Sequence, residues 1–296
     1  MTQNSIKVVD RATGKTFDEV ILGEKWIRWA YQDAGSSLLE RVLFRSSLVS
    51  RLFGAWFDSP LSRGKIASVI DELSIDMKEA RDPVESFACF NDFFVRHLKP
   101  EARPFDEDPH QIVSPADGRV LVFPKLDEDV FVPVKGHPMS IRTMLPGLYE
   151  RFLGGALAIM RLCPADYHRY HFPTAGRIVE SHDIPGALHS VNPIALGAGP
   201  DVFGANKRSL TLIETETAGT MCFVEVGAFG VGSIVNTTTA GTVTKMQEKG
   251  YFKFGGSTVV VVFEPGKIRF SDDLISNSDK GLETLVKVGQ PLATAL

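Results

Sequence analysis

The pattern of hydrophobic and polar residues divides the chain into two parts. Between about residues 24 and 100, apolar residues recur at intervals of three and four, which predicts helices. From about residue 110 onward, short apolar runs alternate with glycine, proline and aspartate, which predicts closely spaced strands. Pro100 and Pro104 mark the boundary, because proline ends helices. We therefore expect an α+β protein, with a mainly helical region at 1–105 and a mainly antiparallel β sandwich or barrel-like core at 106–296.

The strand signal is also present at the start of the chain. Ile6, Val8 and Val9 read as a strand, and a turn follows at residues 12–14. In the second part, apolar runs bounded by turn-forming residues lie at 112–113, 118–123, 157–162, 210–213, 222–226, 234–235 and 258–263.

One segment of the helical part is amphipathic. Residues 37–57 have a broad apolar face, which includes Leu48, Leu52, Phe53 and Trp56, and three arginines among them. Such a helix can lie in a membrane interface with its apolar face down and its arginines near lipid phosphates. It can equally pack on a protein core, and the pattern alone leaves both interpretations open.

The composition excludes several classes of protein. Of 296 residues, 44% are hydrophobic and 23% are charged, with a formal net charge of −4 and no long basic run, so we expect no nucleic-acid partner. The three cysteines lie far apart, and the histidines lack ligand spacing, so we expect no disulfide and no metal. No stretch of 18 apolar residues exists, and the polar first residues lack a signal-peptide pattern.

A serine after two glycines, just before a fully apolar strand, is the first candidate for chemistry. The segment Gly255-Gly256-Ser257-Thr258 precedes the apolar run at 259–263. Glycine lets other groups approach the backbone closely, so the Ser257 hydroxyl could attack the carbonyl of Gly256 and form an ester. Elimination and hydrolysis would then leave a pyruvoyl group. An ordinary turn before a strand is the alternative interpretation.

Two further segments carry groups suited to acid–base chemistry. Asp117, between Pro115-Ala116 and Gly118, can orient and charge a histidine, or can simply cap a turn. His168 and His171 are three residues apart and would point to different sides of an extended segment, which favours two separate roles over one metal site. Two hydrogen-bonded core histidines are the alternative interpretation.

Taken together, these segments resemble the phosphatidylserine decarboxylase family. The resemblance lies in the order and the sequences of several motifs: SPADG at 114–118, DYHRYHFP at 166–173, EKGYFKFGGST at 248–258, FEPGKI at 263–268 and GQPL at 289–292. It covers roughly residues 85–293, and the front third is similar to the longer helical front of one bacterial branch. Many members have leucine where this chain has Gly255, a difference that leaves the Gly256-Ser257 pair intact.

The resemblance implies a role for each of these residues. Asp117, His171 and Ser257 would form a charge relay that cuts the chain between Gly256 and Ser257, giving chains 1–256 and 257–296. Ser257 would become the covalent pyruvoyl cofactor, which forms a Schiff base with phosphatidylserine and releases CO₂ to give phosphatidylethanolamine. His168 is the candidate proton donor.

The resemblance also implies partners and a location. We expect phosphatidylserine and an anionic membrane surface as partners, a heterodimer of the two cleaved chains with further dimerisation left open, and a peripheral position on the cytoplasmic face of the membrane. Two alternatives remain open: a serine hydrolase that uses the same Asp, His and Ser set, and a pyruvoyl decarboxylase of another aminophospholipid.

Overall fold

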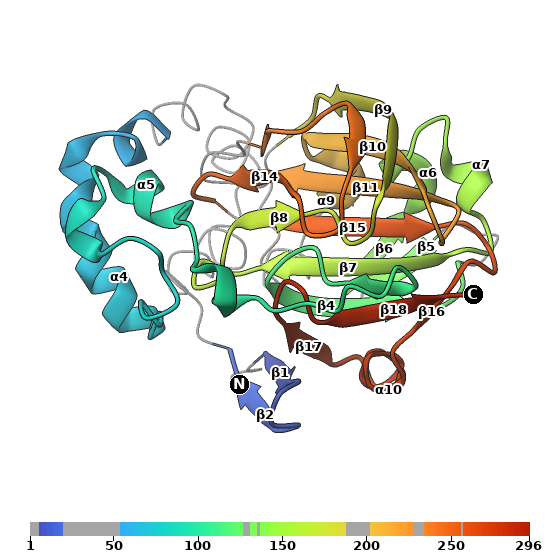
Figure 1. Ribbon diagram of the computed structural model, residues 1–296, viewed down its shortest axis with the longest axis horizontal. Helices are drawn as coiled ribbons and strands as arrows, with labels where there is room; N and C mark the ends of the chain where they lie inside the picture. The colour runs from blue at the N-terminus through green and yellow to red at the C-terminus, as the bar shows by residue number, and fades with distance from the viewer. Residues whose placement is uncertain are drawn as a thin grey trace, which may run out of the picture.

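The fold places a large β-sheet beside a smaller helical region. The structure is a computed structural model, and it describes residues 6–19, 54–126, 131–134, 137–187, 202–227, 234–255 and 257–296. In Figure 1 the helices of the front part lie at one side of the sheet, and the N-terminal hairpin lies below it. The α+β class expected from the hydrophobic pattern is confirmed.

The main sheet has ten strands and is almost entirely antiparallel. Each neighbouring pair runs antiparallel except β17 and β1, which run parallel. In spatial order the strands are β13 (Gly241–Val243), β9 (Gly176–Ile184), β10 (Arg208–Thr215), β11 (Thr220–Gly227), β15 (Ser257–Phe263), β7 (Ala156–Leu162), β4 (Gly118–Phe123), β17 (Glu283–Val286), β1 (Lys7–Asp10) and β2 (Thr16–Asp18). The sheet ends at β13 and β2, so among the described strands it stays open and forms no closed barrel.

Smaller sheets and helices cover the two faces of this sheet. The smaller sheets are β12 (Ile234–Asn236), β14 (Glu248–Phe252) and β8 (Arg169–His171); β16 (Ile268–Phe270), β18 (Pro291–Ala295) and β3 (Gln111–Val113); and β5 (Phe131–Val134) with β6 (His137–Ser140). The helices of this part are α6 (Ile141–Met144), α7 (Tyr149–Phe152), α9 (Val202–Ala205) and α10 (Asp272–Asp279).

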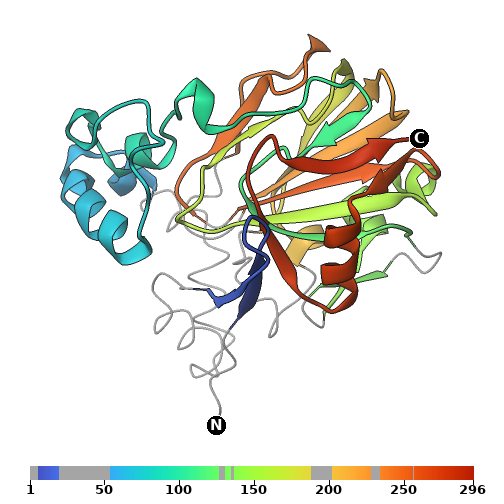
Figure 2. The ribbon, with the colours of Figure 1, turned by 60° about the horizontal axis from the view of Figure 1, so that its bottom comes forward.

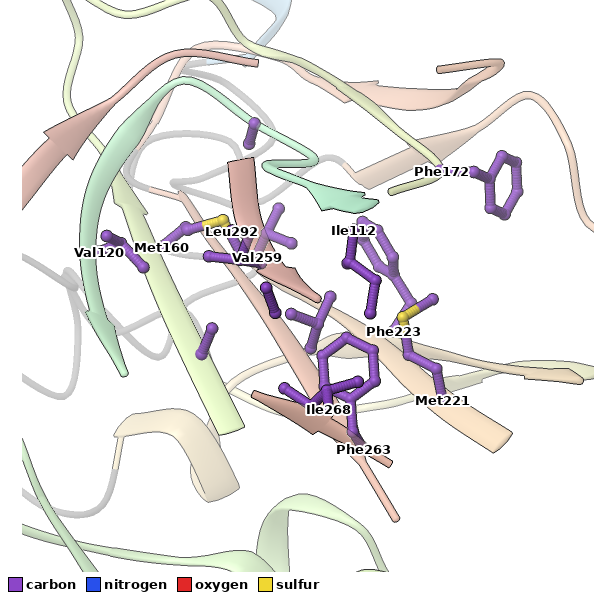
Figure 3. Packing of buried hydrophobic residues seen from close by; sticks show 14 of the residues in the cluster. Ile112, Val120, Met160, Phe172, Met221, Phe223, Val259, Phe263, Ile268 and Leu292 are labelled. Carbon is purple, nitrogen blue, oxygen red and sulfur yellow. The ribbon is translucent and has the colours of Figure 1, made fainter. Parts of the chain in front are cut away.

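Strand β15 separates the two hydrophobic cores. Val259, Val261 and Phe263 belong to the core beneath the two three-stranded sheets, which also contains Phe172 and Phe223 (Figure 3). The residues between them, at 260 and 262, belong to the core beneath α6 and α7. Because successive side chains of a strand point to opposite faces, a continuous apolar run is what a strand buried on both faces requires.

The helical front packs as a third cluster of its own. Its described elements are a helical segment at 54–57, 3₁₀ turns at Pro60–Lys65, Val84–Ser86 and Pro100–Ala102, α4 (Ile66–Leu73) and α5 (Phe90–Phe94). Its buried residues are mostly phenylalanines: Phe57, Ile66, Ile75, Phe87, Phe90, Phe93 and Phe94. Phe254 packs against this cluster, so the front contacts the chain just before Ser257. Within the described ranges, no helix is long and apolar enough to cross a membrane.

The N-terminal hairpin belongs to the main sheet although it precedes the helical front. The expected strand and turn are confirmed as β1 and β2, with the turn between them. Val8 and Val9 of β1 lie opposite Glu283 and Thr284 of β17, at the other end of the sequence. Figure 2 shows this hairpin alongside the last strands of the chain. The sheet therefore joins the two ends of the protein.

Removal of a side chain from this core should destabilise the protein strongly. Phe263 has no exposed surface, and Phe263→Ala should lower the free energy of unfolding by about 3–5 kcal/mol through lost burial and a cavity. Urea unfolding measures it, with Ser257→Ala present in every protein compared so that no reaction at that hydroxyl can affect the result. The matched control is Phe105→Ala, whose side chain is 39% exposed; it should change stability by about 1 kcal/mol or less. Equal losses would contradict this description of the core.

Candidate active site

Ser257 lies at the start of the central strand, in a fully paired position. It is the first residue of β15 and lies opposite Leu162 of β7 on one side and Gly227 of β11 on the other. The residue is 1% exposed. Its Oγ atom is buried and has no hydrogen-bond partner in the described part of the chain. By strand alternation the hydroxyl lies on the same sheet face as Val259, beneath the three-stranded sheets.

Two parts of the chain adjoin this position, and we call residues 162–168, 252–255 and 257 together the site ring. At one end of the ring Leu162 pairs with Ser257. At the other end the backbone N–H of Phe252 donates to the carbonyl of His168 at 2.9 Å. Strands β14 and β8 are paired, so the histidine segment runs beside the strand that leads into Ser257. Gly256, the other half of the expected cleavage site, lies outside the described residues.

His168 is a buried, neutral imidazole with one free nitrogen. Its Nδ1 lies 2.9 Å from the carbonyl oxygen of Asp166, and a carbonyl can only accept, so Nδ1 carries the proton. Nε2 is then an unprotonated acceptor, and it has no hydrogen-bond partner among the described residues. Burial lowers the pKa of His168 to about 3, and the charge of Arg96 adds to this. The side chain is therefore neutral near neutral pH and can accept a proton at Nε2.

His171 is the last residue of the short strand β8, and its ring lies against Tyr167. The two ring centroids are 6.0 Å apart. The Nδ1 atom is buried and without a partner in the described structure. Burial lowers the pKa of His171 to about 4, and the negative charge of Asp117 acts in the opposite direction and favours the protonated form. His171 is thus neutral near neutral pH, with a carboxylate close enough to stabilise it once it is protonated.

Asp117 is anchored just before β4 by an arginine that the sequence did not single out. Arg103 donates to both carboxylate oxygens, from Nε at 3.0 Å and from Nη2 at 2.5 Å. The backbone N–H of Val288 donates to Oδ1 at 2.8 Å. The Asp117 loop lies beside His171, since the N–H of His171 donates to the carbonyl of Pro115 at 2.8 Å. The structure brings Asp117 and His171 into one neighbourhood, but no hydrogen bond joins their side chains.

Ion pairs hold the loop that carries His168. Asp166 accepts a bond from the backbone N–H of Cys163 at 2.6 Å and forms an ion pair with Arg119. Arg119 lies opposite Arg161 on the neighbouring strand. Arg161 pairs in turn with Glu283 at 2.7 Å. These bonds close the turn between β7 and β8 and so set where Nε2 of His168 lies.

The end of the helical front forms a wall of the site ring. The side-chain carbonyl of Asn91 accepts a bond from the backbone N–H of Phe254 at 2.8 Å. The ring of Phe94 lies 3.9 Å from the ring of His168, centroid to centroid. Phe57 contacts Phe254 at 4.3 Å. The front part is therefore packed against both segments of the ring rather than set apart from them.

Gly255 has a backbone conformation that other residues rarely adopt. Its φ is +150°, outside the regions that side chains with a Cβ normally occupy. Glycine at this position is thus in keeping with the local backbone, although many members of the family that the sequence resembles have leucine there.

A buried ion pair on the same sheet face was also missed from the sequence. Lys249 and Glu225 are completely buried and bonded to each other, and Lys249 also donates to Asn236 at 3.0 Å. Glu225 lies opposite Val259, on the face that Ser257 shares. Burial raises the pKa of Glu225, and Lys249 opposes that shift. The Glu-Lys-Gly sequence at 248–250 is typical of an exposed turn, so the ion pair becomes evident only once the pairing of the strands is known.

The expected membrane contacts are described only in part. Leu48, Leu52 and Phe53 lie outside the described residues. Trp56 is 39% exposed, and Leu61 in the following 3₁₀ turn is 82% exposed. Among the described residues, no group of three or more His, Cys, Asp or Glu side chains is placed to hold a metal ion.

The buried neutral histidine should make stability depend on pH. In the unfolded chain a histidine binds a proton below a pH of about 6.5, whereas folded His168 does so only near its lowered pKa of about 3. Folding stability should therefore fall as the pH falls between these values, by about 1.4 kcal/mol per pH unit from this group.

Urea unfolding of the Ser257→Ala protein between about pH 6.5 and 4.5 tests this. His168→Gln should reduce the slope of stability against pH. Phe94→Leu, which changes the ring stacked on His168 but removes no titrating group, should keep the parent slope. An unchanged slope in His168→Gln would show that folded His168 binds its proton as readily as the unfolded chain.

Known proteins resemble this chain over nearly its whole length. A sequence model of the family described as phosphatidylserine decarboxylase matches residues 90–294. The phosphatidylserine decarboxylase proenzyme of Clostridium perfringens is 41% identical over 97% of this chain and 99% of that protein. Those of Clostridium beijerinckii and Ruminiclostridium cellulolyticum are 37% and 36% identical, each over 98% of this chain and over 99% and 98% of their own lengths. This chain therefore belongs to the phosphatidylserine decarboxylase family, a family of carboxy-lyases.

Proposed function

We propose that this protein is a phosphatidylserine decarboxylase that cuts itself between Gly256 and Ser257 and works with a pyruvoyl group made from Ser257. The observation that carries the proposal is the Ser257 hydroxyl, which is buried, has no hydrogen-bond partner among the described residues and lies within a ring closed by His168. A buried hydroxyl without a partner is unfavourable, so its persistence points to chemistry at that atom. Relatives named as proenzymes give independent support.

The cut begins with attack of Ser257 Oγ on the carbonyl carbon of Gly256. The C–N bond of that peptide breaks as an ester C–O bond forms, and the proton of the hydroxyl ends on the freed amine. Loss of the Cα proton of Ser257 then expels the Gly256 carboxylate and leaves a dehydroalanine. Water replaces its nitrogen, which leaves as ammonia, and a pyruvoyl group remains at the start of chain 257–296.

His171 is suited to take the proton from the Ser257 hydroxyl. Its imidazole is neutral near neutral pH, and the charge of Asp117 favours the protonated form that the transfer creates. Asp117 stays in place because Arg103 and the backbone of Val288 hold its carboxylate. Arg103 thus acts through Asp117 as a positioning residue.

The residues at Ser257 fit a pyruvoyl group. Oγ of Ser257, Nε2 of His168 and Nδ1 of His171 are buried polar atoms with no hydrogen-bond partner among the described residues. Once formed, a pyruvoyl group supplies a ketone for a Schiff base with the substrate amine and a sink for the electron pair left when CO₂ departs. The surrounding residues supply burial, which keeps water from that electron pair.

His168 can carry the proton that the decarboxylation needs. A serine headgroup arrives with a protonated amine, which must lose a proton before it can attack a ketone. The free Nε2 of His168 can accept that proton and later return it to the carbon from which CO₂ has left. The candidate proton donor is therefore first an acceptor, because its Nδ1 proton is bound to the Asp166 carbonyl.

Replacement of Ser257 should leave the chain whole. Ser257→Ala has no hydroxyl, so we expect a single chain of 32.5 kDa, where the unaltered protein gives chains 1–256 and 257–296. Intact-mass spectrometry measures this, and the small chain should be lighter than a serine-initiated chain by the mass of one ammonia. Ser209→Ala, which removes another buried hydroxyl, is the control and should be cut normally.

The same measurement separates this function from a serine hydrolase. An unaltered chain that remains whole after long incubation with membranes, and that reacts at Ser257 with a fluorophosphonate, would overturn the proposal in favour of the hydrolase. A cut chain that decarboxylates another aminophospholipid but not phosphatidylserine would keep the pyruvoyl chemistry and overturn the substrate.

We also propose that the front part docks on the cytoplasmic face of an anionic membrane. Two large apolar side chains, Trp56 and Leu61, are exposed there. Trp56 contacts Phe57 at 4.8 Å, and Phe57 contacts Phe254 beside the site ring. A surface bound through this front would hold a lipid headgroup near the ring without extraction of the acyl chains into water, which costs about 0.8 kcal/mol per CH₂.

Acidic residues on this front should release the protein from lipid. We expect Trp56→Asp with Leu61→Asp to reduce co-sedimentation with phosphatidylserine-containing vesicles by about tenfold or more, because charge in the interface opposes insertion. Self-cleavage should continue. The control is Val179→Asp, an exposed apolar residue of β9, which should bind as before. Full binding by the double variant would contradict this docking surface.

A further inference from the structure

Arg96 is a buried cation that forms no ion pair with any of the described residues. The residue is 5% exposed. Nη2 makes one weak hydrogen bond of 3.4 Å to the carbonyl of Ala165. Nε and Nη1 are buried and have no acceptor among the described residues. An ionised group in this state is unfavourable unless something pairs with it.

The other arginines around the site are paired. Each of the following contacts at least one carboxylate: Arg103, Arg119, Arg161 and Arg169. Besides the weak bond to Ala165, Arg96 faces the ring of Phe93, 5.1 Å from its guanidinium carbon. Within the part of the chain that the structure describes, carboxylates pair with the neighbouring arginines and none pairs with Arg96, which leaves the N–H groups of Nε and Nη1 for a ligand that is not part of the protein.

Arg96 belongs to the wall of the site ring. It follows Val95, whose carbonyl accepts a bond from Arg169 at 2.8 Å, and Phe94, whose ring lies on His168. Its contact residue Ala165 lies within the ring segment 162–168. Residues 94–96 thus contact the segment that carries the two histidines at three successive positions.

The charges nearby show that Arg96 and the reacting groups share one electrostatic neighbourhood. Burial lowers the pKa of Arg96, while the charges of Asp117 and Asp166 oppose that shift. The positive charge of Arg96 also contributes to the lowered pKa of His168. A ligand bound to Arg96 would therefore lie close to the histidine proposed to carry the proton.

A phosphatidylserine headgroup offers two oxyanions, and only one suits a fixed cation. An ion pair with the carboxylate would be strongest before the reaction and would disappear as CO₂ forms, which would raise the barrier. The phosphodiester keeps its charge throughout. A guanidinium donates through adjacent N–H groups in a geometry that matches phosphate oxygens.

We propose that Arg96 binds the phosphodiester of the substrate headgroup through its guanidinium, whose Nε and Nη1 have no acceptor among the described residues. This inference rests on the function proposed above. Arg96 is then a binding residue that positions the headgroup next to the site ring. Binding would require the phosphodiester and not the amino acid portion alone. Self-cleavage involves no phosphate and should not depend on it.

The test compares Arg96→Gln and Arg96→Lys with Arg177→Gln, a matched control at an exposed arginine paired with Glu214. Intact mass first establishes that each protein is cut. Steady-state rates with phosphatidylserine in mixed micelles should then show KM raised about 10- to 100-fold in Arg96→Gln and less in Arg96→Lys, with kcat little changed. The Arg177 control should keep the parent KM.

Two soluble inhibitors identify which oxyanion is bound. Glycerophosphoethanolamine carries the phosphodiester without the carboxylate, and O-methylserine carries the carboxylate without the phosphodiester. Arg96→Gln should weaken inhibition by the first about tenfold or more and leave inhibition by the second as it is. The reverse pattern would assign Arg96 to the carboxylate and overturn the proposal.

Unchanged KM and unchanged inhibition in a cut Arg96→Gln protein would also overturn it. If Arg96→Gln does not fold, Arg96→Lys decides the question, because lysine keeps the positive charge but lacks the forked N–H donors of a guanidinium. Inhibition by glycerophosphoethanolamine that is equal in Arg96→Lys and in the parent protein would overturn the proposal. Failure of the unaltered protein to cut itself or to release CO₂ would instead count against the proposed function.

Discussion

The site depends on the pairing of one strand. Strand β15 is bonded to β11 and β7 on its two sides and is buried on both faces. Its first residue, Ser257, therefore has little freedom of position.

Burial then determines the electrostatics. The two histidines stay neutral because a charge in this environment lacks water. Among the described residues, Arg103, Arg119, Arg161 and Arg169 have carboxylate partners, whereas Nε and Nη1 of Arg96 have no acceptor. Arg103 holds the carboxylate of Asp117 and is itself held by Glu79 at 2.9 Å. The helical front thus contributes Glu79, Arg96 and Arg103 to a site whose candidate reacting residues come from the β-rich part of the chain.

Much of this could be predicted from local patterns, and the rest depends on contacts distant in sequence. The apolar run at 259–263 predicts a doubly buried strand, and the motifs around Asp117, His168, His171 and Ser257 predict which side chains matter. The parallel pairing of β1 with β17 has no local signal, because it joins the two ends of the chain. The role of Arg103 is also hidden, since an arginine in a charged stretch looks exposed until its carboxylate partner is known.

The strands after Ser257 are interleaved with the rest of the sheet. β15 lies between β11 and β7, β17 lies between β4 and β1, and β18 pairs with β3. Residues 257–296 consequently have no core of their own. If the backbone is cut before Ser257, as we propose, the protein could no longer unfold and refold as a single molecule: regaining the fold would require two chains to meet, so refolding would become concentration-dependent. The lifetime of the cut protein would then be set by how slowly the sheet opens.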